Sequence, residues 1–163
     1  MNRRALFWIS FIGLVVLDQV VKGWARSAMP EGSSIALPWP GVLELKLVFN
    51  HGVAFGMFQG AGVLLAPVAI LIAGWAAYHS WKHAEEAKWV HFGLAMLASG
   101  ALGNLWDRLT QGKVTDLFWI RVIDFPVFNV ADICITFAAV VMVFWLRKAE
   151  SPKPATAPET PAS

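Results

Sequence analysis

Charged residues and cysteine are both scarce in this chain of 163 residues. Only 15% of the residues are Asp, Glu, Lys or Arg, whereas soluble domains usually carry about 25%. Cys134 is the only cysteine, which excludes a disulfide framework and a cysteine-based metal site. It lies in an apolar run, where we interpret it as a small packing residue. Because the net charge is only +2 and the basic residues are scattered, no nucleic-acid partner is expected.

Motifs for metal-dependent and serine-based chemistry are also missing. The chain has no H-E-x-x-H motif, and His51 and His91 have no matching ligands nearby, so no metal or cofactor is expected. His79 and His83 stand near short basic links. Neither a G-x-S-x-G motif nor a phosphate-binding loop occurs, and Lys22 lacks a suitably placed serine.

Apolar residues, in contrast, make up 57% of the chain, with a mean hydropathy of +0.56 and nine tryptophans. This composition predicts a small integral membrane protein of one domain, residues 1–150. A spanning helix needs about 20 mostly apolar residues. The basic start "MNRR" and the apolar run after it resemble a signal peptide, but further apolar segments follow, so we interpret it as a retained first span. Four segments qualify as spans, at about residues 4–26, 61–81, 89–108 and 130–146.

The links between the predicted spans contain two strand-like segments. In "VLELKLVFN", residues 42–50, apolar residues alternate with Glu44 and Lys46, which predicts a half-buried strand between the first two spans. "VTDLFWIRV", residues 114–122, is interpreted as a second strand before the fourth span. The expected fold is therefore an all-α membrane protein with a small strand region. Residues 151–163 are rich in Pro, Ala and Thr and are expected to be a disordered tail.

The unusual polar residues lie at span ends that four crossings bring to one side of the membrane. An ionisable residue at membrane depth costs free energy and tends to mark a functional site. The functional site is therefore expected on this side of the membrane. The basic residues on the side of the termini lie in short loops near the span ends, which favours cytoplasmic termini and an extracytoplasmic site. The clustered residues are Asp18, Lys22, Asn50, Asn104, Asp107, Arg108, Asp116, Asn129 and Asp132.

Simpler structural roles are open for two of these pairs. Asp18 and Lys22 stand at i and i+4 on one helix, where an ion pair would let the span end at the interface with Lys22 snorkelling to water. Asp107 and Arg108 could merely terminate the third span. Asn104 lies about one turn deeper and requires a hydrogen-bond partner there.

The stretch "VTDLFWIRVIDFPVFNVAD", residues 114–132, carries three acids at even spacing. Asn129 is a good N-cap for the fourth span, and Asp132 would sit near its positive end, so capping alone could explain both. Two facing carboxylates can also hydrolyse an amide without a metal or cofactor. Asp124 stands near Arg121 and before a proline, and we interpret it as a turn or surface-pair residue.

Five segments in order resemble the motifs of the bacterial lipoprotein signal peptidase family, signal peptidase II: "LDQVVK", "NHGVAFG", "GALGNLWDR", "VTDLF" and "FNVAD". The resemblance covers roughly residues 14–135, with small departures at Ser99 and Leu117. It implies Asp116 and Asp132 as the catalytic dyad. The supporting or substrate-contacting residues would be Asp18, Lys22, Asn50, Gly52, Asn104, Asp107, Arg108, Asn129 and Ala131.

The same resemblance implies an intramembrane aspartic endopeptidase of the bacterial inner membrane. Its substrates would be prolipoproteins that carry a diacylglyceryl group on a cysteine, and it would cut the signal peptide just before that cysteine. We expect a monomer that contacts membrane lipids. The competing interpretation is a non-enzymatic transporter or channel subunit with an acidic proton relay. Such a relay should have acids deep in the bilayer or on both faces, whereas here they gather on one side.

Overall fold

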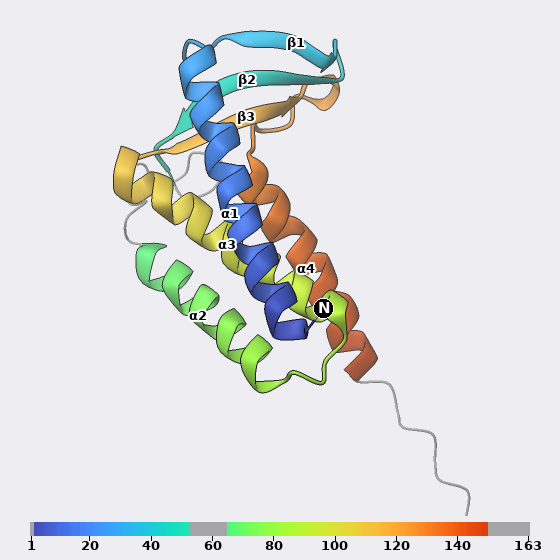
Figure 1. The fold of residues 1–163 in the computed structure, drawn as a ribbon. Helices are drawn as coiled ribbons and strands as arrows, with labels where there is room; N and C mark the ends of the chain where they lie inside the picture. Colours follow the sequence, from blue (N-terminus) through green and yellow to red (C-terminus); the bar gives the residue numbers. More distant parts are fainter. Residues whose placement is uncertain (1, 53–64, 150–163) are drawn as a thin grey trace, which may run out of the picture.

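The computed structural model describes residues 2–52 and 65–149 as four helices with a three-stranded sheet across one end of the bundle (Figure 1). The predicted tail, residues 151–163, and the first residues of the predicted second span, 61–64, lie outside the described residues. The helices are α1 (Arg3–Ala28), α2 (Ala66–Lys82), α3 (Lys88–Gln111) and α4 (Val130–Ala149). The strands are β1 (Ser34–Trp39), β2 (Leu43–Asn50) and β3 (Val114–Ile120), and the 3₁₀ turn η2 (Arg121–Ile123) follows β3.

The ends of the helices follow local sequence chemistry. The side chain of Asn2 caps α1 by accepting a hydrogen bond from the backbone N–H of Arg4 at 3.1 Å. Pro67 stands in the first turn of α2, where no N–H is needed. Gly112 ends α3 with φ 69°, the left-handed conformation that favours glycine. This sharp end of α3 directs the chain straight into β3.

Helix α3 is the centre of the bundle and packs against α1, α2 and α4. Two glycines of α3 allow α4 and α1 to approach it closely. A Cβ atom at Gly100 would lie 2.5 Å from the carbonyl oxygen of Ala131, and one at Gly103 would lie 2.7 Å from Asp18 Oδ2. Small residues at helix interfaces let backbones approach in this way. Cys134 is buried in the α3–α4 interface beside Met96, which confirms its prediction as a packing residue.

The sheet has the order β1-β2-β3, and both pairings are antiparallel. Leu47 of β2 and Leu117 of β3 pack against Ala25 and Met29 at the end of α1, which fixes the sheet on the bundle. The strands predicted at β2 and β3 are confirmed. Strand β1 was not predicted individually, because its residues are all exposed and Pro38 interrupts the strand pattern.

Glu44, which the alternation places on the polar face of β2, is nevertheless covered. Its side chain is only 1% exposed. It accepts hydrogen bonds from the backbone N–H of Gly41 at 2.8 Å and from Arg121 Nη1 at 2.9 Å. The register of the β2–β3 pair also shifts between Leu45 and Val48, which a simple period of two does not foresee.

Two of the described helices are long and apolar enough to cross a membrane by length and composition, α1 and the Val130–Arg147 part of α4. Large apolar side chains such as Ile9, Val20 and Phe144 point outward from them and are exposed. Helices α2 and α3 are present where spans were predicted, with α2 described over 17 residues. The four helices are therefore confirmed, whereas a membrane crossing by all four stays a prediction.

Candidate active site

The residues predicted for the site meet where the sheet covers the ends of the helices (Figure 1). They come from five elements that are far apart in sequence: the last turns of α1 and α3, the end of β2, the middle of β3 and the first turn of α4. Hydrogen bonds and ion pairs connect them into one network. Its members include Asp18, Lys22, Asn50, Gly52, Asn104, Asp107, Arg108, Asp116, Asn129, Ala131 and Asp132.

Asp116 lies on β3, opposite Val48 of β2, and is 4% exposed. Its Oδ1 accepts a hydrogen bond from Asn129 Nδ2 at 2.7 Å, and the side chain of Asn50 also donates to it. Burial and, after it, the negative charge of Asp132 raise the pKa of Asp116 to about 7, against the smaller opposing effects of its hydrogen bonds and of Lys22. Asp116 therefore keeps a proton close to neutral pH.

Asp132, in the first turn of α4, is held by two neutral donors. Its Oδ1 accepts from Asn104 Nδ2 at 2.8 Å, and its Oδ2 accepts from the backbone N–H of Asn129 at 3.1 Å. In return, Asn129 Oδ1 accepts from the backbone N–H of Asp132 at 3.0 Å, so the pair forms a reciprocal cap. Capping is thus confirmed, but it does not explain why Asn129 also binds Asp116.

Lys22 determines how the two asparagines are oriented. Its Nζ donates to Asn104 Oδ1 at 3.0 Å. An ammonium group cannot accept a hydrogen bond, so the oxygen of Asn104 must face Lys22 and its amide nitrogen must face Asp132. Asn129 Nδ2 also donates to the same Asn104 oxygen, at 3.0 Å. One buried cation therefore fixes the donors that hold both acids.

Snorkelling of Lys22 is wrong as an interpretation, because its side chain has no exposed surface. The ammonium points inward, where Asp18 Oδ2 lies at 2.9 Å and Asp107 Oδ2 at 3.6 Å. Asp18 Oδ1 in turn accepts from the backbone N–H of Ala131 at 2.9 Å. The Asp18–Lys22 pair consequently holds the first turn of α4 in place, which merely ending a span would not require.

Asp107 and Arg108 likewise do more than terminate α3. Asp107 has no exposed surface, and its Oδ2 accepts from the backbone N–H of Thr115 at 2.9 Å. Arg108 Nη2 donates to the carbonyl oxygen of Gly52 at 3.2 Å, and its Nη1 donates to that of Asn104 at 3.3 Å. One residue thus binds the strand that carries Asp116, and the other binds the segment after β2.

Arg26 and Thr115 belong to this network but were missed as site residues. Arg26 Nη1 donates to Thr115 Oγ1 at 2.8 Å and lies 3.7 Å from Asp107 Oδ1. Its position four residues after Lys22, on the same face of α1, was a usable signal, whereas Thr115 gives none. Asp124 is exposed, takes φ 47° and accepts from Trp119 Nε1 at 3.1 Å, which confirms it as a turn residue.

In residues 2–52 and 65–149, no group of three or more His, Cys, Asp and Glu side chains is arranged to hold a metal ion. Asp116 and Asp132 instead accept hydrogen bonds from two different N–H groups of one residue, Asn129, and two neighbouring carboxyl groups can divide one proton between them. Such a pair can move protons to and from a bound water and an amide without another group.

Comparison with known proteins identifies the family of the chain. Residues 10–148 match the family described as signal peptidase (SPase) II. The lipoprotein signal peptidase of Gloeobacter violaceus is 38% identical over 96% of this chain and 89% of that protein. That of Streptococcus pneumoniae is 32% identical over 92% of this chain and 97% of that protein. A solved bacterial membrane enzyme, determined by the in meso method, superposes with a TM-score of 0.84 at 28% identity over 92% of both chains.

Proposed function

The chain belongs to the signal peptidase II family, and we propose that it is an aspartic endopeptidase whose catalytic pair is Asp116 and Asp132. Membership of the family makes it a peptidase that removes signal peptides from prolipoproteins. One observation carries the aspartic mechanism: Asp116 is buried, protonated near neutral pH and joined to Asp132 through Asn129.

The two acids have different tasks in this mechanism. Asp132 stands in the first turn of α4 and accepts two hydrogen bonds, which orient it as the base that removes a proton from water. Asp116 holds the shared proton and polarises the scissile carbonyl oxygen. The water oxygen bonds to the carbonyl carbon, and the tetrahedral intermediate collapses when the C–N bond breaks and a carboxyl group protonates the leaving amine.

The surrounding residues support the pair. Asn104 and Asn129 hold the carboxyl groups in a fixed orientation, and Lys22 and Asp18 hold the asparagines and the start of α4. Arg108, bound to the carbonyl oxygen of Gly52, is near both acids and available to the charge that develops on the carbonyl oxygen. Asn50, Gly52 and Ala131 complete the set as supporting or substrate-contacting residues around the pair.

The substrates in this proposal are prolipoproteins with a diacylglyceryl group on the cysteine, cut just before that cysteine. Exposed apolar side chains on the helices, such as Leu17 of α1 and Phe137 of α4, supply a surface for acyl chains and for the apolar part of the signal peptide. Recognition of the lipid would add specificity that a short peptide motif lacks. Residues 1–150 act as one domain, as a monomer.

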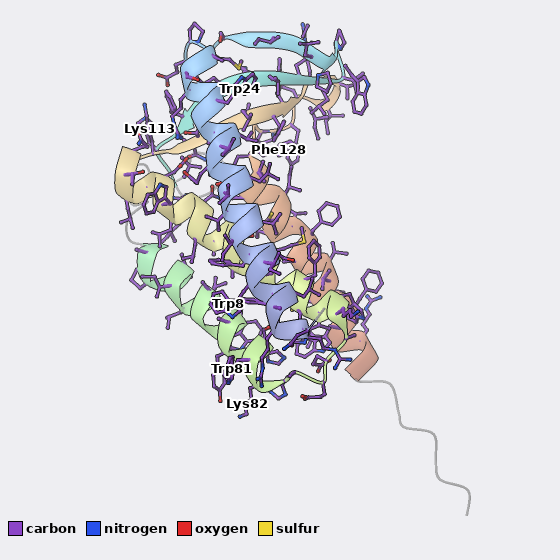
Figure 2. All side chains as sticks on the ribbon, in the orientation of Figure 1. Trp8, Trp24, Trp81, Lys82, Lys113 and Phe128 are labelled. Carbon is purple, nitrogen blue, oxygen red and sulfur yellow. The ribbon has the colours of Figure 1, made fainter. Side chains whose placement is uncertain are left out.

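In the membrane, we place all four helices as spans of the bacterial inner membrane. Exposed tryptophans favour the two membrane–water boundaries. Trp8 and Trp81 lie toward the end of the bundle away from the sheet, and Trp24 lies near the sheet, which supports a crossing along α1 (Figure 2). With both termini in the cytoplasm, the sheet and the catalytic pair lie at the extracytoplasmic face.

Replacement of either acid tests the proposal most directly. Asp116→Asn and Asp132→Asn each remove one titratable oxygen and keep the volume of the side chain. We expect each to lower the turnover of a lipidated prolipoprotein by about 1,000-fold or more, in line with the loss of general acid–base catalysis. Turnover is measured in bilayers, with insertion and thermal unfolding checked for each variant.

Near-normal turnover by either variant would overturn the assignment of the pair. The unlipidated form of the same prolipoprotein is the substrate control, and we expect it to be cleaved far more slowly. The alternative, a transporter or channel subunit, has no support in the comparisons; it would be revealed by ion flux through reconstituted vesicles without any proteolysis.

A further inference from the structure

We infer that Arg26 is a positioning residue that fixes the backbone of β3 beside Asp116, acting through Thr115 and Asp107. The inference rests on the proposed aspartic mechanism and adds a residue from outside the five motifs. Arg26 makes contacts with Thr115 and Asp107 and has no described contact with either catalytic acid.

The backbone that carries Asp116 is anchored on both flanks by groups outside the sheet ladder. Strand β3 is an edge strand of the sheet and pairs along its length with β2. On one flank the N–H of Thr115 donates to Asp107 Oδ2 at 2.9 Å, and on the other the N–H of Leu117 donates to the carbonyl oxygen of Phe128 at 3.0 Å. The position of Asp116 thus depends on a side-chain anchor on one flank and a backbone anchor on the other.

The side-chain anchor depends on a cation. Asp107 is fully covered, and a buried carboxylate without a counter-charge is strongly destabilised. Lys22 lies 3.6 Å away but is closer to Asp18, at 2.9 Å. Asp107 Oδ1 has no hydrogen bond within the described part of the chain, and Arg26 Nη1 faces it at 3.7 Å. Arg26 therefore supplies the charge that keeps this oxygen stable.

Arg26 also holds Thr115 directly, by donating to its Oγ1 at 2.8 Å. Thr115 is consequently fixed twice, at its side chain by Arg26 and at its backbone by Asp107. A shift at this point moves the next residue, Asp116, relative to Asn129 Nδ2, which now lies 2.7 Å from it. Misplacement of a catalytic group by about 1 Å can lower a rate by about 100-fold.

The same sheet provides a matched control. Arg121 Nη1 contacts both oxygens of Glu44, at 2.9 and 3.2 Å, and Glu44 is only 1% exposed. This is again a partly exposed arginine that neutralises a covered carboxylate. It lies at the other end of the β2–β3 pair, where Leu43 is opposite Ile120, away from Asp116.

The test compares Arg26→Gln with Arg121→Gln in cleavage of a lipidated prolipoprotein by the full chain in bilayers. We expect Arg26→Gln to lower kcat by about 10- to 100-fold with KM within about twofold, since the catalytic geometry changes and the substrate contacts do not. Arg121→Gln should keep kcat within about twofold. Arg26→Lys retains the charge and should recover most of the kcat.

A second variant removes only the hydrogen bond. Thr115→Val keeps every charge and the branched shape, so it is expected to fold and to lower kcat with little change in KM. The double variant Arg26→Gln/Thr115→Val should be no slower than Arg26→Gln alone, because both changes break the same hydrogen bond between Arg26 and Thr115. Thermal unfolding of each variant separates a loss of folding from a loss of turnover.

Three outcomes would overturn the inference: equal kcat for Arg26→Gln and Arg121→Gln, strictly multiplicative effects in the double variant, or no recovery with lysine. Each leaves the proposed function standing as long as Asp116→Asn is inactive. Normal turnover by Asp116→Asn would instead remove the proposed function itself, whatever the Arg26 variants do.

Discussion

Asp116 and Glu44 are covered carboxylic acids on neighbouring strands of one small sheet, and their surroundings shift their pKa values in opposite directions. Burial and the charge of Asp132 raise the pKa of Asp116 to about 7. The backbone N–H of Gly41, and then the guanidinium of Arg121, lower the pKa of Glu44 below its ordinary value. Both acids accept hydrogen bonds at distances below 3 Å. Hydrogen bonding alone therefore does not decide whether these acids are ionised.

The difference lies in the balance between burial and the hydrogen-bond partners: burial is the largest cause at Asp116, whereas the hydrogen bonds from Gly41 and Arg121 outweigh it at Glu44. Asp116 is held by the neutral amides of Asn129 and Asn50, which fix its position without neutralising a negative charge. Glu44 is held by the backbone N–H of Gly41 and by a cation, which together fix its position and favour its ionised form. An acid that transfers protons requires the first arrangement, whereas an acid that only joins two strands is better served by the second.

Among the changes that keep both acids, the largest expected effect comes from giving Asp116 a cationic partner like that of Glu44. Asn50 Oδ1 accepts from the backbone N–H of Gly52 at 2.9 Å, which leaves its amide nitrogen facing Asp116. In Asn50→Lys the ammonium would replace that nitrogen and lower the pKa of Asp116. We expect kcat at pH 7 to fall by about 100-fold, because neither carboxyl then holds the proton. The pH profile of kcat from pH 5 to 8 measures this.

Asn50→Gln is the matched control for this variant, because it keeps a neutral donor on a longer side chain. It should reduce kcat by about tenfold at most and leave the shape of the profile unchanged. Asn50→Lys should in contrast recover part of its activity at lower pH. A wild-type profile in Asn50→Lys would show that partner charge does not control the ionisation of Asp116.

An intermediate effect is expected in the pH dependence of stability. The folded pKa of Asp116 lies above its ordinary value of 3.8, so between about pH 4 and 7 the folded protein binds a proton that the unfolded chain does not. The free energy of unfolding therefore falls as pH rises through this window. At about 1.4 kcal/mol per pH unit, Asp116 lowers the free energy of unfolding by about 4 kcal/mol at most across this window. Thermal unfolding of wild type and Asp116→Asn in the same detergent measures it.

Glu44→Gln tests the opposite dependence of the free energy of unfolding on pH. Because the pKa of Glu44 is lowered from 4.5, its contribution is present above pH 4.5 and is lost as pH falls below that value. Wild type should thus lose stability relative to Asp116→Asn when pH rises, and relative to Glu44→Gln when pH falls. Parallel curves for wild type and Asp116→Asn from pH 4 to 7 would contradict the raised pKa of Asp116.

The sequence predicted which residues meet but not how they divide their tasks. Four apolar segments in succession are enough to bring the polar ends of the helices together, and the family motifs identify Asp116 and Asp132 within that group. The orientation of a long side chain is not encoded by helical spacing. Lys22 points inward, where oxygens of Asn104 and Asp107 on a second helix join Asp18 around its ammonium group.

Residues with two roles were harder to predict from the sequence than residues with one. Asn129 fits the pattern of an N-cap, and this role is confirmed, but its amide nitrogen also holds Asp116, thirteen residues earlier in the chain. Thr115 gives no signal in sequence, because its role depends on an unpaired strand edge facing Asp107. Strand β1 is held by pairing with β2 rather than by a buried face of its own, so it has no apolar alternation to read.

The smallest effect is expected at Asp124, the third acid of the stretch that contains both proposed catalytic acids. It is exposed at the turn after η2 with φ 47°, a conformation that asparagine tolerates as well as aspartate does. Asp124→Asn also keeps an oxygen that can accept from Trp119 Nε1, now at 3.1 Å. Turnover should stay within about twofold of wild type and stability within about 0.5 kcal/mol. A loss as large as that of Asn50→Lys would mean that charge anywhere on the rim of the sheet reaches Asp116, and the contrast with Glu44 would then be one of distance rather than of partner.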